Sequence, residues 1–296
     1  MGVFSLYFTT VVIWGTTWLA IELQLNQVDP ILSVGYRFIF AAIFLIIFCR
    51  IRKISLNFSI KDHLIIGLQG ITLYGCSYCL IYMASQYLVS GIVAVIFSTI
   101  LVINILNLRF FLGQSVSPAT LFGGVLGCVG IGLVFWPELS AFRINEGVIG
   151  LILAILATYS ASIGNIIAVY ISARQIGVTQ ANTLGMAYGG ILVFVFGFFA
   201  TGEIQFSFSL DYLVPLLYLS IFGSVIAFGC YITLINRIGA DRAAYAIILN
   251  PILALLLSTF YENYKWTDLA LIGVVLIVLG NVIVLIPASK FRQLIG

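Results

Sequence analysis

The chain has 296 residues, of which 62% are apolar and only 8% carry a charge. This composition excludes a soluble globular domain, in which about a quarter of the residues are charged. The net charge of +3 is small and gives no reason to expect a nucleic-acid partner. We therefore expect a protein embedded in the lipid bilayer.

Apolar stretches that are long enough to cross a bilayer, about 17 to 25 residues each, recur along the whole chain. They cover residues 3–22, 31–50, 64–85, 91–112, 118–136, 147–170, 183–201, 212–235, 242–261 and 267–287. The first stretch has no basic n-region and no small-residue cleavage site, which indicates a permanent helix and not a signal peptide. The sequence thus predicts an all-α membrane protein with ten transmembrane helices and no soluble domain.

The 13 Lys and Arg residues are distributed unequally between the two sides of the membrane. If the N-terminus lies inside, Arg143 and Lys265 fall outside and Arg37 falls within a segment. The inner side then holds Arg50, Arg52, Lys53, Lys61, Arg109, Arg174, Arg237, Arg242, Lys290 and Arg292. By the positive-inside rule, both termini are predicted to be cytoplasmic.

Five segments followed by five more would place the second half of the chain upside down, because each half crosses the membrane an odd number of times. We therefore predict two inverted five-helix repeats, residues 1–140 and 146–296. An offset of about 150 residues aligns glycines of the fifth and tenth segments, Gly123 with Gly273 and Gly130 with Gly280. Inverted repeats are typical of secondary transporters.

Four short motifs carry a family resemblance: Trp14-Gly15-Thr16-Thr17, Tyr36-Arg37-Phe38, Ile221-Phe222-Gly223-Ser224 and Asn250-Pro251. In this order and with this topology, they resemble the ten-helix EamA-type branch of the drug/metabolite transporter superfamily. The resemblance covers nearly the whole chain. It implies an inner-membrane carrier of small metabolites, frequently an exporter of amino acids or related compounds, with a cavity between the two halves.

The chain departs from the family pattern at the ends of the fourth and ninth helices. The family often has a Gly-Glu pair there, whereas this chain reads Gly113-Gln114 and Asn263-Tyr264. Glu262 is displaced by two residues, so no role of that family acid is carried over to it.

Two aromatic stripes are candidates for the walls of the cavity. Trp14, Trp18 and Glu22 are spaced by four in the first segment, and Tyr78 and Tyr82 share the same spacing in the third. Residues four apart lie on one face of a helix. We assign Trp14, Trp18, Tyr78 and Tyr82 as candidate substrate-binding residues. The indole N–H of Trp14 lies near the midplane, where hydrocarbon offers no partner. Core packing and interfacial anchoring remain the alternatives for these stripes.

Arg37 is the only basic side chain deep in a segment, roughly 10 Å below the outer surface at 1.5 Å per residue. An arginine at a helix centre costs about 2.5 to 3.5 kcal/mol to insert, so it is expected to face a wet cavity or a carboxylate. Two roles are open. Arg37 pairs with Glu22 and is structural, or it attracts the carboxylate of a substrate.

Asparagines inside apolar segments need hydrogen-bond partners. Asn104 and Asn107 are three apart on one face, and Asn250 precedes Pro251, whose missing N–H kinks a helix. We predict that Asn104 and Asn250 bind substrate and that Pro251 is a hinge. Adhesion between helices is the alternative for each asparagine.

The sequence offers no catalytic residues, no metal ligands and no cofactor site. The single histidine, His63, lies in a basic connection, and Cys76 and Cys79 lack the further ligands that a metal site needs. No phosphate-binding glycine loop is present, so direct use of ATP is not expected. Glu22, at the outer end of the first segment, is the nearest candidate for ion coupling.

We therefore expect a monomeric, multi-pass inner-membrane carrier that exports or exchanges amino acids or related metabolites by alternating access of an aromatic-lined cavity. Efflux of drug-like cations is the alternative within transport, because aromatic faces suit cations. A structural or sensor subunit of the membrane, without flux of its own, is the alternative from another class.

Overall fold

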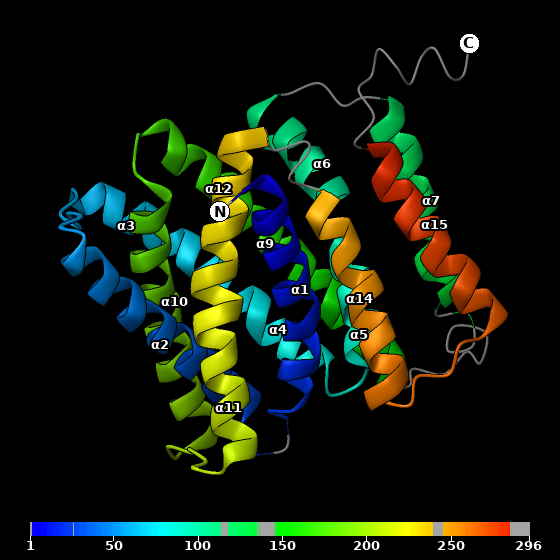
Figure 1. The fold of residues 1–296 in the computed structure, drawn as a ribbon, viewed down its shortest axis with the longest axis horizontal. Helices are drawn as coiled ribbons and strands as arrows, with labels where there is room; N and C mark the ends of the chain where they lie inside the picture. The colour runs from blue at the N-terminus through cyan, green and yellow to red at the C-terminus, as the bar shows by residue number, and fades with distance from the viewer. Residues whose placement is uncertain are drawn as a thin grey trace.

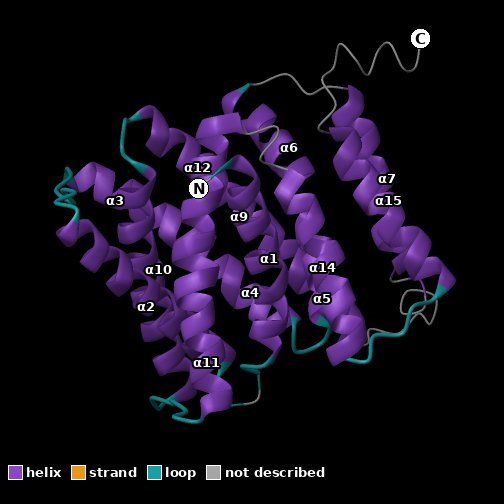
Figure 2. Cartoon of the chain, viewed as in Figure 1, coloured by secondary structure: helices purple, strands orange, loops and turns teal. Residues whose placement is uncertain are grey.

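The computed structural model describes residues 2–25, 27–113, 118–134, 136, 146–238 and 245–284, and all regular elements in these ranges are helical. Figures 1 and 2 show the helices and the short loops that join many of them. The elements are α1 Val3–Glu22, α2 Pro30–Ile51, α3 Ile60–Gln69, η1 Gly70–Cys76, α4 Ser77–Ala84, α5 Ser90–Ser98, α6 Ile100–Leu112, α7 Pro118–Val134, α9 Glu146–Ala173, α10 Val178–Thr201, α11 Leu210–Tyr218, η2 Leu219–Ile226, α12 Ala227–Ile238, α14 Tyr245–Tyr261 and α15 Asp268–Val284.

Seven stretches of the described chain are long and apolar enough to cross a membrane: Val3–Glu22, Pro30–Ile51, Ile60–Ala84, Ser90–Phe111, Gly147–Ala173, Val178–Thr201 and Leu210–Tyr231. Three further apolar helices are shorter: Leu121–Val134, Leu249–Tyr261 and Asp268–Ile283. The prediction of an all-helical membrane protein is confirmed at this level. The count of ten crossings and their direction stay predictions.

Two predicted segments begin a turn or more earlier in the structure, and one of them, expected at 64–85, begins at Ile60. The segment expected at 183–201 begins at Val178, because the side chain of Gln180 accepts a hydrogen bond from the backbone N–H of Gly177 over 3.0 Å. This contact satisfies one of the free N–H groups at the start of the helix. The polar residues of the first turn lie outside any apolar window, and hydropathy therefore misses them.

The helices pack in pairs that join the two halves of the chain. α2 packs against α10, α5 against α14, and α7 against α15. α1 contacts α12 and α14, whereas α9 contacts α4 and α6. Figure 1 shows α7 and α15 side by side at one edge of the molecule, with α2, α3 and α10 gathered at the other edge.

Glycines bring α7 and α15 into backbone contact. A Cβ atom on Gly130 would lie 2.5 Å from the carbonyl oxygen of Gly273, and a Cβ atom on Gly280 would lie 2.5 Å from that of Gly123. Real Cβ atoms do not approach a carbonyl so closely, so these positions require glycine. The glycines that the sequence offset aligns therefore face each other across one helix pair.

Two π-helical segments interrupt long helices. η1 lies between α3 and α4, and η2 lies between α11 and α12. In each segment a backbone carbonyl accepts a hydrogen bond from a side chain of another helix: Thr72 from Ser160 over 2.8 Å, and Gly223 from Trp14 over 3.2 Å. π-helical turns of this kind are frequent at functional sites.

Candidate functional site

A cavity of about 440 Å³ lies among α1, α4, α5, α6, α9, α12 and α14. Its aromatic lining consists of Trp14, Trp18, Tyr78, Phe97, Phe228 and Tyr231. Its polar lining consists of Thr17, Ser98, Asn104, Asn165 and Asn250. A mostly apolar wall with a few convergent polar groups is the usual construction of a small-molecule site.

Trp14 occupies the junction between α1 and the second half of the chain. Its indole Nε1 donates to the carbonyl of Gly223, which supplies the partner that the sequence required. Its ring lies 5.2 Å from the ring centroid of Phe228 and 5.0 Å from that of Tyr231. Trp14 is therefore held in one orientation while its face remains part of the cavity wall.

The two asparagines predicted to share a face of α6 have different environments. Asn104 lines the cavity, and its Oδ1 accepts from Nδ2 of Asn165 over 3.3 Å. Asn107 is buried and donates to Oγ of Ser162 over 2.8 Å, which joins α6 to α9. The structure thus places Asn104 in the cavity and assigns Asn107 to contact between helices.

Asn250 and Pro251 both line the cavity from α14. The Oδ1 atom of Asn250 is buried and has no hydrogen-bond partner within the part of the chain that the structure describes. A buried acceptor of this kind is available to a ligand that carries a donor.

Arg37 is not among the residues that line the cavity, and the ion pair with Glu22, one of the two roles that the sequence left open, is not formed. Its Nε donates to Oγ of Ser224 over 3.3 Å, and its guanidinium carbon lies 4.6 Å from the ring centroid of Tyr78. Among the described residues, the ion pair within 4 Å joins Arg174 to Asp62 instead, at 2.6 Å. Arg37 therefore contacts η2 and α4.

Tyr82 is fully buried and lies outside the cavity lining, so it is not an interfacial anchor. Its hydroxyl donates to Oε1 of Gln24 over 2.8 Å and lies next to the Arg37 guanidinium. Tyr78, one turn earlier, lines the cavity. Of the two tyrosines of the stripe, Tyr78 therefore belongs to the cavity wall and Tyr82 to the buried contacts behind it.

Glu22 lies outside the cavity lining, at the end of α1. Its Oε2 is buried and without a partner among the residues described, and the nearby carboxyl group of Glu262 repels its negative charge. Glu262 accepts a hydrogen bond from the backbone N–H of Ser90 over 2.7 Å and another from the Ser90 hydroxyl. The displaced acid thus caps the start of α5.

Sequence reasoning missed Phe97, Phe228 and Tyr231 as wall residues. One signal was present, because the offset of about 150 residues that aligns the glycine pairs also aligns Phe228 with Tyr78. The sequence also gave no sign that Gln24 would bind the hydroxyl of Tyr82, since a single glutamine beyond a helix end belongs to no periodic pattern.

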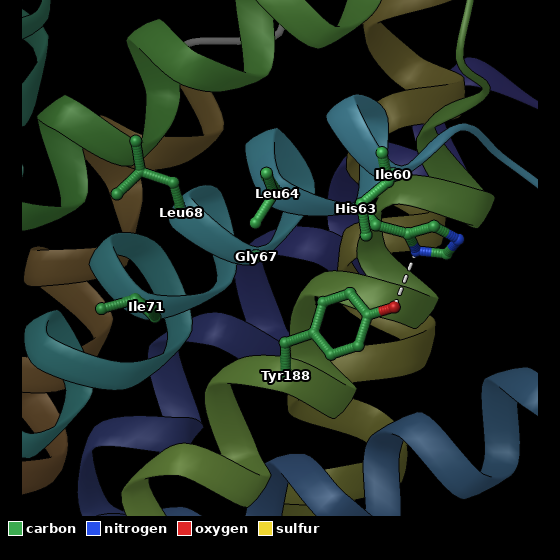
Figure 3. Close-up of a pocket in the computed structure, with 7 residues that line it drawn as sticks. All are labelled: Ile60, His63, Leu64, Gly67, Leu68, Ile71 and Tyr188. Atoms are coloured by element: carbon green, nitrogen blue, oxygen red, sulfur yellow. Dashed lines mark hydrogen bonds between the residues drawn. The ribbon is translucent and has the colours of Figure 1, made fainter.

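A second hollow lies along the surface of α3, and Gly67 and Tyr188 are among the residues that line it (Figure 3). The hydroxyl of Tyr188 is 2.7 Å from Nδ1 of His63. Ile60 and Leu64 at its rim are largely exposed, as side chains in contact with lipid would be. The central cavity, with its convergent polar groups, is therefore the stronger candidate site.

Comparisons with known proteins place the chain among transporters. It is 25% identical to protein PagO of Salmonella typhimurium over 93% of this chain and 90% of that protein. It is 26% identical to the uncharacterized inner membrane transporter YedA of Escherichia coli over 95% of this chain and 92% of that protein. A probable amino-acid metabolite efflux pump of Escherichia coli is 22% identical over 91% of this chain and 90% of that protein.

One solved crystal structure has the same fold, with a TM-score of 0.67, 18% sequence identity, and coverage of 95% of this chain and 96% of that one. The model of the EamA-like transporter family matches residues 1–136 and again residues 148–286. The protein is thus a multi-pass membrane transporter, and the chain belongs to the EamA-like transporter family.

Proposed function

We propose that the protein is a secondary carrier of the inner membrane that exports or exchanges amino acids or related small metabolites. The observation that carries this proposal is the central cavity, whose aromatic rings suit a flat or apolar side chain while its amides suit polar groups. The relative named as a probable amino-acid metabolite efflux pump supports this substrate class. Trp14, Trp18, Tyr78, Asn104 and Asn250 are the proposed binding residues.

We further propose that the chain consists of two inverted five-helix repeats. The packing supports this proposal, because exchanging the halves converts two of the main contacts into other observed contacts. The contact of α1 with α12 becomes that of α9 with η1 and α4, and the contact of α1 with α14 becomes that of α9 with α5 and α6. The two separate matches of the family model also support it.

The orientation of the repeats is proposed to place both termini in the cytoplasm. Single cysteines test this in a cysteine-free background, with a maleimide that cannot cross the membrane. Glu203→Cys should react from outside, and Lys53→Cys should react only after the membrane is opened. The reverse pattern would refute the proposed orientation.

Alternating access requires a part of the molecule that moves. We propose η1, η2 and the Pro251 region of α14 as the hinges, since π-helical turns and internal prolines weaken the regular helical hydrogen-bond pattern. The hydrogen bonds to Thr72 and Gly223 then join each π-helical segment to the opposite half of the protein.

Flux into liposomes tests the transport function. The purified protein should move radiolabelled amino acids across the membrane. Asn250→Leu should slow this flux and leave the unfolding temperature nearly unchanged. Liposomes without protein are the control. If no solute crosses, the protein is a structural or sensor subunit and the proposal fails.

Efflux of drug-like cations is the second candidate, because the six aromatic rings of the wall present faces that attract cations. Thermal stabilisation separates the two candidates. A ligand at one hundred times its Kd raises stability by about 2.7 kcal/mol. Stabilisation by cationic dyes and not by amino acids would favour the second candidate.

A further inference from the structure

Two buried side chains outside the cavity lining have nitrogen atoms without a hydrogen-bond partner among the described residues. They are Nη1 of Arg37 and Nε2 of Gln24, and each residue is only 1% exposed. Leaving a buried donor unpaired is costly, and in folded proteins such groups are rare. Two of them close to one another call for an explanation.

Tyr82 lies between these two side chains. Its hydroxyl donates to Oε1 of Gln24 over 2.8 Å, so the amide oxygen is occupied and only the amide N–H₂ group is left for a ligand. The same hydroxyl lies next to the Arg37 guanidinium. The free groups around Tyr82 are therefore hydrogen-bond donors, and one of them carries a full positive charge.

Neighbouring side chains do not neutralise this charge. Ser224 accepts from Nε of Arg37 and is itself neutral, while the described acidic groups lie beyond 4 Å of the guanidinium. Glu22, the acid of α1, forms no ion pair with it. A buried cation with free donors and no counter-ion is complementary to an anion.

Tyr78 separates this group from the central cavity. Its ring lines the cavity and at the same time lies over the guanidinium, 4.6 Å from ring centroid to the central carbon. The ring is also in edge contact with Phe38, at 4.8 Å between centroids. The ring of Tyr78 therefore contacts both the cavity and the Arg37 guanidinium.

We propose that Arg37, Gln24 and Tyr82 form a carboxylate-binding subsite that a substrate in the cavity reaches when the ring of Tyr78 moves aside. A charged hydrogen bond between guanidinium and carboxylate is stronger than the ring contact it replaces. This inference rests on the proposed transport function and narrows its substrate class to compounds with a free carboxylate and an apolar side chain. Neutral amides of the same compounds would occupy the cavity without using the subsite.

Phenylalanine and phenylalaninamide test this directly, because they differ only in the carboxylate. Binding and flux are measured with purified protein, wild type and Arg37→Gln. The wild type should prefer phenylalanine, and the variant should lose roughly tenfold or more of its affinity for phenylalanine, as expected for one charged hydrogen bond. The affinity of the variant for phenylalaninamide should stay within about twofold of that of the wild type, because independent effects add to within about that margin.

Two further variants distinguish a loss of binding from a loss of folding. Arg37→Lys keeps the charge and should retain part of the preference for phenylalanine, whereas Gln24→Leu removes one donor and should lower phenylalanine affinity alone. Arg174→Gln removes an arginine from the surface and is the matched control. Unfolding temperatures are recorded for each protein.

The outcomes separate the two proposals. Equal loss for phenylalanine and its amide in Arg37→Gln, or no preference in the wild type, would overturn the carboxylate subsite while transport stands. If the wild type moves neither compound nor any other amino acid, the proposed function fails and the subsite with it. A selective loss for phenylalanine in both Arg37→Gln and Gln24→Leu supports the subsite.

Discussion

The indole nitrogen of Trp14 and the carbonyl oxygen of Gly223 lie 3.2 Å apart and form a hydrogen bond between α1 and the π-helical segment η2. The contact joins a cavity wall to a segment whose backbone departs from regular α-helical geometry. Movement of η2 would therefore move Trp14, and the binding surface would change with the conformation of the helix.

Removing this hydrogen bond should affect both stability and transport. Trp14→Phe keeps an aromatic ring but leaves the carbonyl without its donor, so the free energy of unfolding should fall by about 1 kcal/mol. Flux should fall several-fold. Thermal unfolding in detergent measures the change in stability, and uptake into liposomes measures the change in flux. Trp136→Phe, at an exposed position, is the control and should change neither.

The glycine contact between α7 and α15 predicts a sharp difference between neighbouring positions. Gly130→Ala places a Cβ atom against Gly273 and Ile277, and overpacking of this kind costs about 1 to 3 kcal/mol. Gly127→Ala, one turn earlier, meets no atom within 4 Å and should be neutral or slightly stabilising. Equal unfolding temperatures for the two variants would contradict the described contact.

Asn104 and Asn107 should separate function from stability. Asn107→Leu leaves the buried Ser162 hydroxyl without its donor and should cost about 1 to 3 kcal/mol of unfolding free energy. The flux for each folded molecule of Asn107→Leu should equal that of the wild type. Asn104→Leu should lower flux and change the unfolding temperature little, because Asn104 lines the cavity. The ratio of flux to folded protein distinguishes the two effects.

Glu22 is the residue to examine for ion coupling. If a proton moves with the substrate through this carboxyl group, Glu22→Gln should remove the dependence of flux on an imposed pH gradient. Glu203→Gln, which removes an exposed carboxylate, should keep that dependence. Unchanged flux and unchanged pH dependence in Glu22→Gln would exclude coupling through this residue.

Much of the molecule was predictable from local pattern. Hydrophobic length located the membrane helices, because a bilayer requires about 20 consecutive apolar residues whatever the fold. Spacing by four placed Trp14, Trp18 and Tyr78 on helix faces that do line the cavity. The need of an indole N–H for a partner at the midplane was also visible, since it follows from the chemistry of one residue.

The sequence by itself determined the class of protein, the positions of most helices and several cavity residues, because helix formation in lipid depends on neighbouring residues along the chain. Only the tertiary structure decided that Arg37 contacts Ser224 and Tyr78 in place of Glu22, and that Tyr82 binds Gln24. These contacts join helices far apart in sequence, and they depend on how side chains from several helices pack into one space. No periodicity within a single segment contains that information.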